Sequence, residues 1–269
     1  MRIIFSFVVL FFCGNSLGQL IIDHNCVDLR QIPMEWIDSA KLKLHIAYGH
    51  TSHGSQITDG MSGLIDFTGG IGGDAYSWND QGEWGNSLDL DDYAMDGDCG
   101  YYPQWVDNTK EYLNQSAHND VNVIMWSWCG QISYYSEDDL LNKYILPMEE
   151  LERDYPHIKF VYMTGHLNYW DYETTTARNE QLREYCRSHQ KILYDFADIE
   201  SYDPEGNFYE FANDNCDYYA DLNNTYQGNW AKEWQDSHEE GKDWFQCGSA
   251  HSEPLNANQK AYAAWYLWA

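Results

Sequence analysis

The sequence predicts a three-layer α/β fold in which a parallel sheet is covered by helices on both faces. Two observations lead to this prediction. Short apolar runs are bounded by polar residues or glycine, and helix-like stretches separate these runs along the chain. Strands buried on both faces read as continuous apolar runs, and strands that alternate with helices are typical of parallel sheets. With 269 residues the chain is long enough to bury such a core.

Four apolar runs are predicted to be strands of one sheet. They occupy residues 43–48, 119–127, 158–164 and 191–196. We expect these strands to be parallel neighbours. Their carboxyl ends should then face a single cleft built from loops, because ligands bind at that edge of open parallel sheets.

Three stretches are predicted to be helices, and two longer ones to be irregular. The helices are expected at residues 138–155, interrupted by Pro147, at 174–189, and at 256–268 with Asn256 as a cap. The irregular segments, rich in Gly, Asp, Asn and aromatic residues, span residues 69–102 and 203–247. We expect these loop insertions to wall the cleft.

Composition limits the classes of partner. Lys and Arg number 15 against 43 Asp and Glu, so the formal net charge is −28. Such a surface repels phosphate backbones and anionic lipid, so we expect neither nucleic acid nor a membrane as partner. The 12 Trp, 22 Tyr and 10 Phe either fill the core or form surfaces that stack on sugar rings. The acidic run from Asp89 to Asp98 is either a solvated loop or a Ca²⁺ site. The Ca²⁺ site is less favoured because the run lacks EF-hand spacing.

The N-terminus has the features of a secretion signal. A positive start at Arg2 precedes an apolar run over residues 3–12, and Ser16 to Gly18 has the small-x-small form of a cleavage site. We therefore predict a signal peptide at 1–18, a single α/β domain at 19–269, and a secreted, extracellular or periplasmic protein. A lipoprotein anchored at Cys13 is disfavoured because bulky phenylalanines precede that cysteine.

The remaining cysteines are even in number, which in an exported chain predicts at least two disulfides. Free buried thiols are the alternative. The six are Cys26, Cys99, Cys129, Cys186, Cys216 and Cys247.

Three polar segments stand at predicted element ends and carry the candidate chemistry. Ser52 lies at the first strand-to-helix junction, where backbone N–H groups can stabilise an oxyanion, with His50 and His53 beside it. His166 ends another strand, and His251 precedes the last helix. The alternative role for Ser52 is a helix cap. We expect Ser52, His166 and His251 to lie in one cleft.

The order of these elements resembles the SGNH (GDSL-type) esterase family. Ser52 in Gly-His-Thr-Ser-His-Gly matches its nucleophile block, and His251 in Ala-His-Ser-Glu-Pro-Leu-Asn matches its terminal block. The resemblance implies a flavodoxin-like sheet, Ser52 as nucleophile, His251 as base and no cofactor. It also implies hydrolysis of a carboxylic ester, for which acylated carbohydrate is the expected substrate.

The sequence departs from the family pattern at two places. The asparagine of the third block is absent after the second predicted strand, and the amide of Gln131 or Asn168 is a candidate replacement. The aspartate expected three residues before the histidine is Gly248, so either Asp243 replaces it or a Ser–His dyad acts alone.

Other classes of function stay open. His50, His53, His166 and His251 could converge on a divalent metal ion, which would suit a metal-dependent hydrolase or, with a tyrosine, a polysaccharide lyase. A carbohydrate-binding protein without catalysis and an exported structural protein are further alternatives.

Overall fold

The computed structural model describes residues 20–67, 72–80 and 86–269. The predicted signal peptide at 1–18 lies outside these residues. Within them, no helix has both the length and the apolar character needed to cross a bilayer.

Over the described residues, seven parallel strands form one sheet in the order β1-β7-β6-β5-β2-β4-β3. The four predicted strands are the neighbours β2, β5, β6 and β7, so the predicted parallel sheet is confirmed. The strands are β1 (Ile21–Ile22), β2 (His45–Gly49), β3 (Trp78–Asn79), β4 (Leu88–Asp92), β5 (Val123–Trp126), β6 (Lys159–Met163) and β7 (Ile192–Tyr194).

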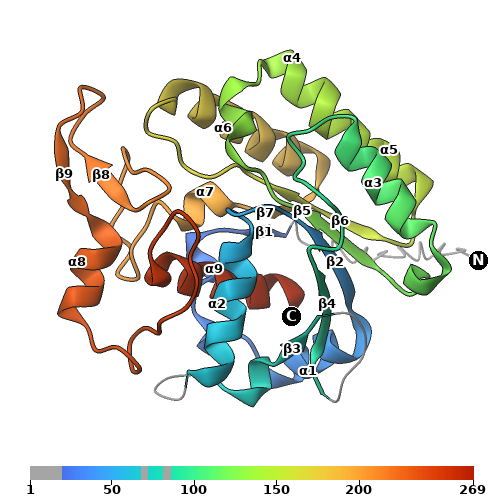
Figure 1. Ribbon diagram of the computed structural model, residues 1–269, viewed down its shortest axis with the longest axis horizontal. Coiled ribbons are helices and arrows are strands. Elements are labelled where there is room, and N and C mark those ends of the chain that lie inside the picture. The colour runs from blue at the N-terminus through green and yellow to red at the C-terminus, as the bar shows by residue number, and fades with distance from the viewer. Residues whose placement is uncertain (1–19, 68–71, 81–85) are drawn as a thin grey trace, which may run out of the picture.

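Helices cover both faces of the sheet, which gives the predicted three layers (Figure 1). Side chains on β2 alternate between two cores, because Ile46 and Tyr48 pack in one and Ala47 in the other. The first face carries α1 (Met34–Lys43), α2 (Ser55–Asp66) and α9 (Pro254–Trp268). The second carries α3 (Gln104–Leu113), α4 (Glu137–Leu140), α5 (Leu146–Asp154) and α6 (Tyr172–His189). Shorter helices are η1 (His24–Cys26), η2 (Leu29–Gln31), η3 (Asp74–Tyr76), η4 (Ser116–His118), η5 (Gly130–Tyr134) and α7 (Phe196–Ile199).

The contact between α2 and α9 requires a glycine. A Cβ atom on Gly60 would lie 2.2 Å from the carbonyl oxygen of Ala257, so only glycine lets the two helices approach this closely. This packing fixes the start of α2 relative to the start of α9, and each start carries one of the candidate site segments.

The predicted helix around Pro147 is continuous but contains a π-turn, η6 (Leu141–Ile145), between α4 and α5. Proline lacks the N–H that would bond the carbonyl of Lys143 in a regular helix. The indole N–H of Trp105 donates to that carbonyl instead, at 3.1 Å. The last helix begins earlier than predicted, with Glu253 as its N-cap, so Asn256 lies inside the helix rather than capping it.

Both segments predicted to be irregular contain regular structure. In β4, Leu88 and Leu90 are buried while the aspartates between and after them bond neighbouring side chains. Asp89 pairs with His45 at 2.8 Å, and Asp92 pairs with His50 at 2.7 Å. The second segment forms a separate antiparallel pair, β8 (Asp217–Tyr219) and β9 (Tyr226–Asn229), followed by α8 (Trp230–Ser237).

The predicted disulfides are absent from the described residues, where all six cysteines are free. The cysteines are spread over different parts of the fold. Cys99 and Cys186 lie in the core under the second face, Cys216 lies beside α8, and Cys129 lies at the carboxyl edge of the sheet. The alternative of free thiols therefore holds in this structure.

Candidate active site

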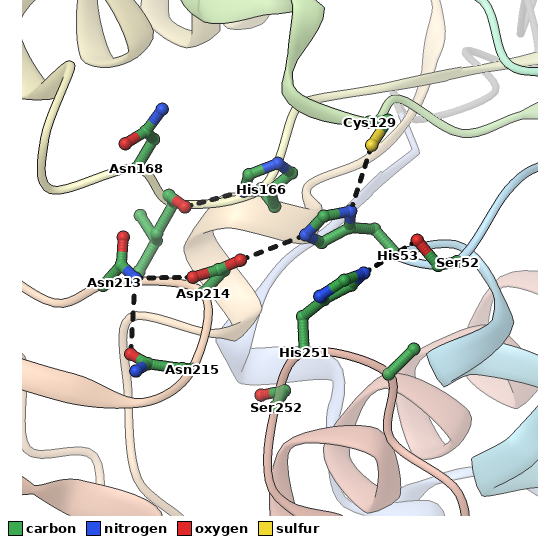
Figure 2. A network of polar contacts seen from close by, with 12 residues as sticks. Ser52, His53, Cys129, His166, Asn168, Asn213, Asp214, Asn215, His251 and Ser252 are labelled. Carbon is green, nitrogen blue, oxygen red and sulfur yellow. Dashed lines mark hydrogen bonds and ion pairs between the residues drawn. The ribbon is translucent and has the colours of Figure 1, made fainter.

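The candidate site lies at the carboxyl edge of the sheet, where several loops meet (Figure 2). Ser52 and His53 follow β2, Cys129 follows β5, and His166 follows β6. Because these strands are parallel, the loops after them share one edge. The loop before β8 adds Asp214, and the loop before α9 adds His251.

Ser52 and His251 form a hydrogen-bonded pair. Ser52 Oγ lies 2.9 Å from His251 Nε2, although 199 residues separate them in the chain. Ser52 is not a helix cap: α2 has Gly54 at its N-cap position without a side-chain bond, and Ser55 Oγ donates to the carbonyl of Ser52. His251 has φ +63°, a left-handed conformation that is costly for a residue other than glycine and that clusters at functional sites.

A stack of three imidazole rings runs through the site. The ring of His53 lies between those of His166 and His251, with centroids 3.9 Å and 4.5 Å away. At its edges His53 contacts two further groups. Its Nε2 lies 3.1 Å from Asp214 Oδ2, and its Nδ1 lies 3.4 Å from Cys129 Sγ (Figure 2).

The central ring, that of His53, is a positively charged imidazolium at neutral pH. Burial opposes the charge on His53, but the hydrogen bonds to Asp214 and Cys129 outweigh it and raise the pKa of His53 to about 9. The hydrogen bond to His53 in turn lowers the pKa of the Cys129 thiol. His53, Asp214 and Cys129 therefore form one connected group of ionisable side chains at this edge of the sheet.

His166, in contrast, is a neutral imidazole at neutral pH. Burial, together with the charge on His53, lowers the pKa of His166 to about 4. Its Nδ1–H donates to the carbonyl of Leu167 at 2.7 Å, so Nε2 is left as an acceptor. This Nε2 is buried and has no hydrogen-bond partner among the described residues.

A buried chain of polar side chains holds the two outer loops in place. Glu200 accepts from the backbone N–H of Leu167 and, at 2.6 Å, from Lys260 Nζ. Lys260 also donates to the side chain of Gln56, whose amide donates to the carbonyl of Ala250. Lys260, Glu200 and Gln56 are each at most 1% exposed. The loops that carry His166 and His251 are thus connected by buried hydrogen bonds next to the site.

Four predicted site residues have other partners. His50 donates to the carbonyl of Thr51 and pairs with Asp92, so it lies outside the imidazole stack. The alternative in which four histidines converge on a metal ion therefore does not hold for His50. The amide of Gln131 donates to Asp98 at 3.3 Å. Asn168 closes a turn, accepting from the backbone of Trp170 and donating to Asp171. Asp243 accepts from the backbone of Glu239 and makes no described contact with His251.

The side-chain amides of Gln131 and Asn168 were the candidates for an oxyanion hole, and both already have hydrogen-bond partners. The Asn168 side chain uses both its donor and its acceptor within its own turn, and the Gln131 amide is directed at a carboxylate. No acidic group described in the structure contacts His251, which leaves the dyad rather than a triad as the geometry around Ser52.

One group of ligand-type atoms could hold a metal ion. Single atoms of His53, His166 and Asp214 all lie within 4.8 Å of one another. However, the two imidazole rings are stacked with planes only 5° apart. Since a ring nitrogen binds a metal in the plane of its ring, an ion in the plane of one would lie outside the plane of the other. The geometry is that of His53 paired with Asp214 and stacked on His166, rather than that of three ligands around one metal ion.

Sequence reasoning missed Cys129 and Asp214 as site residues. Cys129 had a usable signal, because it stands two residues after a predicted buried strand and before a glycine. Asp214 had none, because it lies in a long segment rich in Asn and Asp, 161 residues from the histidine that it contacts.

Comparisons with known proteins place the chain in no family. No family model matches it, and no curated protein matches it. Among solved structures, a proposed acylhydrolase from Bacteroides fragilis is similar over 62% of this chain and 73% of its own, with 12% identity and a TM-score of 0.40. At this TM-score and identity, the likeness identifies neither a family nor an activity.

Proposed function

We propose that this protein is a hydrolase of carboxylic esters, with Ser52 as nucleophile and His251 as general base. The proposal is carried by the hydrogen bond of 2.9 Å between Ser52 Oγ and His251 Nε2. A serine hydroxyl within hydrogen-bond reach of a histidine, at the carboxyl edge of a parallel sheet, is the arrangement that activates a nucleophile. The strained backbone at His251 supports a role beyond packing.

In the proposed reaction, His251 Nε2 accepts the proton as Ser52 Oγ attacks the ester carbonyl. The tetrahedral intermediate collapses when the protonated His251 gives its proton to the leaving alcohol, and the acyl group stays on Ser52. Water then attacks the acyl-serine with His251 again as base, which releases the acid. The backbone N–H of Ser52 makes no hydrogen bond within the described residues, and it is the proposed donor to the oxyanion.

A groove next to the site favours a carbohydrate ester as substrate. It is lined by Tyr169, Trp170, Tyr172, Leu222, Asn224 and neighbouring polar residues. The indole of Trp170 is 65% exposed, which suits stacking on a sugar ring. The loop after β6 carries both His166 of the site and Tyr169 of the groove. The backbone N–H of Tyr169 also donates to Asn213, the residue before Asp214.

Labelling with a fluorophosphonate tests the proposal. We expect one label per chain, found on the peptide that contains Ser52, and loss of the label in Ser52→Ala. We also expect Ser52→Ala to reduce hydrolysis of p-nitrophenyl acetate by about 10³-fold or more with nearly unchanged melting temperature, since Ser52 is not a cap. Ser62→Ala is the matched control, because Ser62 is an exposed serine of α2.

Two results would contradict the proposal. One is full hydrolysis by Ser52→Ala, which would place the nucleophile elsewhere or favour the lyase or metal-dependent alternatives. The other is an unlabelled, inactive wild-type protein that still binds oligosaccharide, which would favour a binding protein.

A further inference from the structure

We propose that Cys129, His53 and Asp214 form a second nucleophilic unit, a Cys–His–Asp triad that accepts an acyl group on Cys129. This inference does not rest on the reaction proposed for Ser52. Its basis is the line of contacts from Cys129 Sγ to His53 Nδ1 at 3.4 Å and from His53 Nε2 to Asp214 Oδ2 at 3.1 Å. A nucleophile, a base within reach of it and a third group that orients the base are the parts of a catalytic triad.

The acid of this unit is itself fixed. Asp214 Oδ1 accepts from the side-chain amide of Asn213 at 2.6 Å, and the carbonyl of that amide accepts from the backbone N–H of Tyr169. The carboxylate is therefore oriented from the loop after β6 as well as from its own loop. This support gives His53 one ring orientation, with Nδ1 directed at the thiol (Figure 2).

Cys129 differs from every other cysteine in the described chain. Burial raises the pKa of the other five thiols, and none of them is described in contact with a histidine. The pKa of Cys129 is lowered by its hydrogen bond to His53. The charged groups around the unit are Asp98, which opposes ionisation of the thiol, and the buried pair of Lys260 and Glu200, whose charges interact with that of Asp214. The rings of His166 and His251 cover the two faces of His53.

A second observation indicates a ligand beside Cys129. His166 is 7% exposed, and its Nε2 is an acceptor without a partner among the described residues. Apart from its two chain neighbours, a Cβ atom placed on Gly130, the residue after Cys129, would meet only this nitrogen, at 4.0 Å, within that part of the chain. An acceptor that is unpaired among the described residues therefore lies beside the residue that follows the thiol. It suits an acyl compound with a hydroxyl or amide N–H near its carbonyl, which would donate to His166.

The proposed step balances within the named groups. The Cys129 thiolate attacks the carbonyl carbon, a carbon–sulfur bond forms, and the bond to the leaving alcohol breaks. The alcohol takes the proton from Nδ1 of the His53 imidazolium, which becomes neutral. Water then attacks the thioester while His53 accepts a proton from it, which releases the carboxylic acid and restores the thiolate and the imidazolium.

The pH dependence of alkylation by iodoacetamide tests the activation of the thiol. Peptide mass spectrometry of the native full chain would give the rate for each cysteine. At pH 6.5 we expect Cys129 to react at least about tenfold faster than Cys247, which is also partly exposed but has a raised pKa, because a difference of one unit changes the thiolate fraction tenfold. His53→Gln should move the half-maximal rate of Cys129 upward, towards that of the denatured chain.

A rate for Cys129 no faster than in the denatured chain, or a profile that His53→Gln leaves unchanged, would overturn the activation of this thiol. If His53→Gln fails to fold, Asp214→Asn with wild-type protein beside it gives the same comparison.

Acyl trapping tests the transfer step and separates it from the Ser52 reaction. Ser52→Ala protein would be mixed with p-nitrophenyl acetate and quenched in acid. We expect an acetyl group on the Cys129 peptide that neutral hydroxylamine removes, and none in Ser52→Ala/Cys129→Ser. Absence of acyl-Cys129 in the Ser52→Ala protein would overturn the inference even if fluorophosphonate labels Ser52 in the wild type.

Discussion

The imidazole of His53 stacks on the imidazole of His251, with ring centroids 4.5 Å apart. Each ring contacts a different potential nucleophile, since His251 bonds Ser52 and His53 contacts Cys129. A protonated ring held against a second ring is stabilised by the π-face of its neighbour as well as by its carboxylate partner. The stack therefore places the Ser52 hydroxyl and the Cys129 thiol in one cluster, because it fixes the position of His251 relative to His53.

The stability of the fold should fall when the pH falls from 6.5 towards 4. Burial and the charge on His53 lower the pKa of His166 to about 4, whereas an unfolded histidine has its ordinary value near 6.5. Between these values the unfolded chain binds a proton that the folded chain does not, so stability present above pH 6.5 is lost on acidification.

Urea unfolding across this pH range measures the effect. His166→Asn should make the fall in stability smaller, because an amide does not titrate in this range. The variant should keep the local structure, because its amide can still donate to the carbonyl of Leu167. Equal slopes for wild type and variant would contradict the assignment to His166.

Lys260→Met should strongly destabilise the protein. The substitution leaves Glu200, which is 1% exposed, without its cationic partner, and breaking a buried pair in this way costs about 3–5 kcal/mol. The free energy of unfolding in urea gives the measurement. Lys232→Met is the matched control, because the Lys232 side chain is 61% exposed in its pair with Glu253 and its loss should cost less than about 1 kcal/mol.

Adding Glu200→Gln to Lys260→Met should recover part of the loss, since the buried charge is then removed. A cost below about 1 kcal/mol for Lys260→Met alone would show that the buried chain does not hold the two loops together.

Thiol counting should find six free cysteines in the chain from residue 20 onward. All six are unpaired, and five have raised pKa values because of burial, so they should react slowly until the protein unfolds. Alkylation in denaturant without reductant, followed by peptide mass spectrometry, counts them. Any peptide pair joined by a disulfide would contradict this arrangement.

The parts of the fold that the sequence predicts are those in which side chains on both faces are apolar. The strand β5 is buried throughout, so its sequence reads as a strand without reference to its neighbours. The strand β4 has the sequence Leu-Asp-Leu-Asp-Asp and looks like an acidic loop. Its carboxylates are stabilised by His45, His50 and Tyr112, which lie elsewhere in the chain, and only the folded structure shows those partners.

The candidate site was predictable to the same extent. Ser52, His166 and His251 stand at element ends, and the topology of a parallel sheet brings such ends to one edge. What the sequence does not show is how each polar group is used. The amide of Asn168 has a partner in its own turn, and the amide of Gln131 donates to Asp98, 33 residues away. Asp214 reaches His53 from a segment without periodicity.

Trp170→Ala should separate substrate binding from chemistry. Trp170 is 65% exposed at the groove, and among the described residues its ring makes only edge contacts with Tyr169 and Tyr219, so removal of the indole should leave the fold intact. A sugar ring stacked on it would lose an aromatic contact worth about 1 kcal/mol, which corresponds to roughly a fivefold rise in KM. We expect this rise for an acetylated xylo-oligosaccharide or chito-oligosaccharide and no change for p-nitrophenyl acetate, which is too small to span the groove. Trp36→Ala is the matched control, because Trp36 is also exposed but lies on α1, outside the groove. If Trp170→Ala alters the hydrolysis of both esters equally, the groove is not a substrate subsite, and the preference for carbohydrate fails while the role of Ser52 stands.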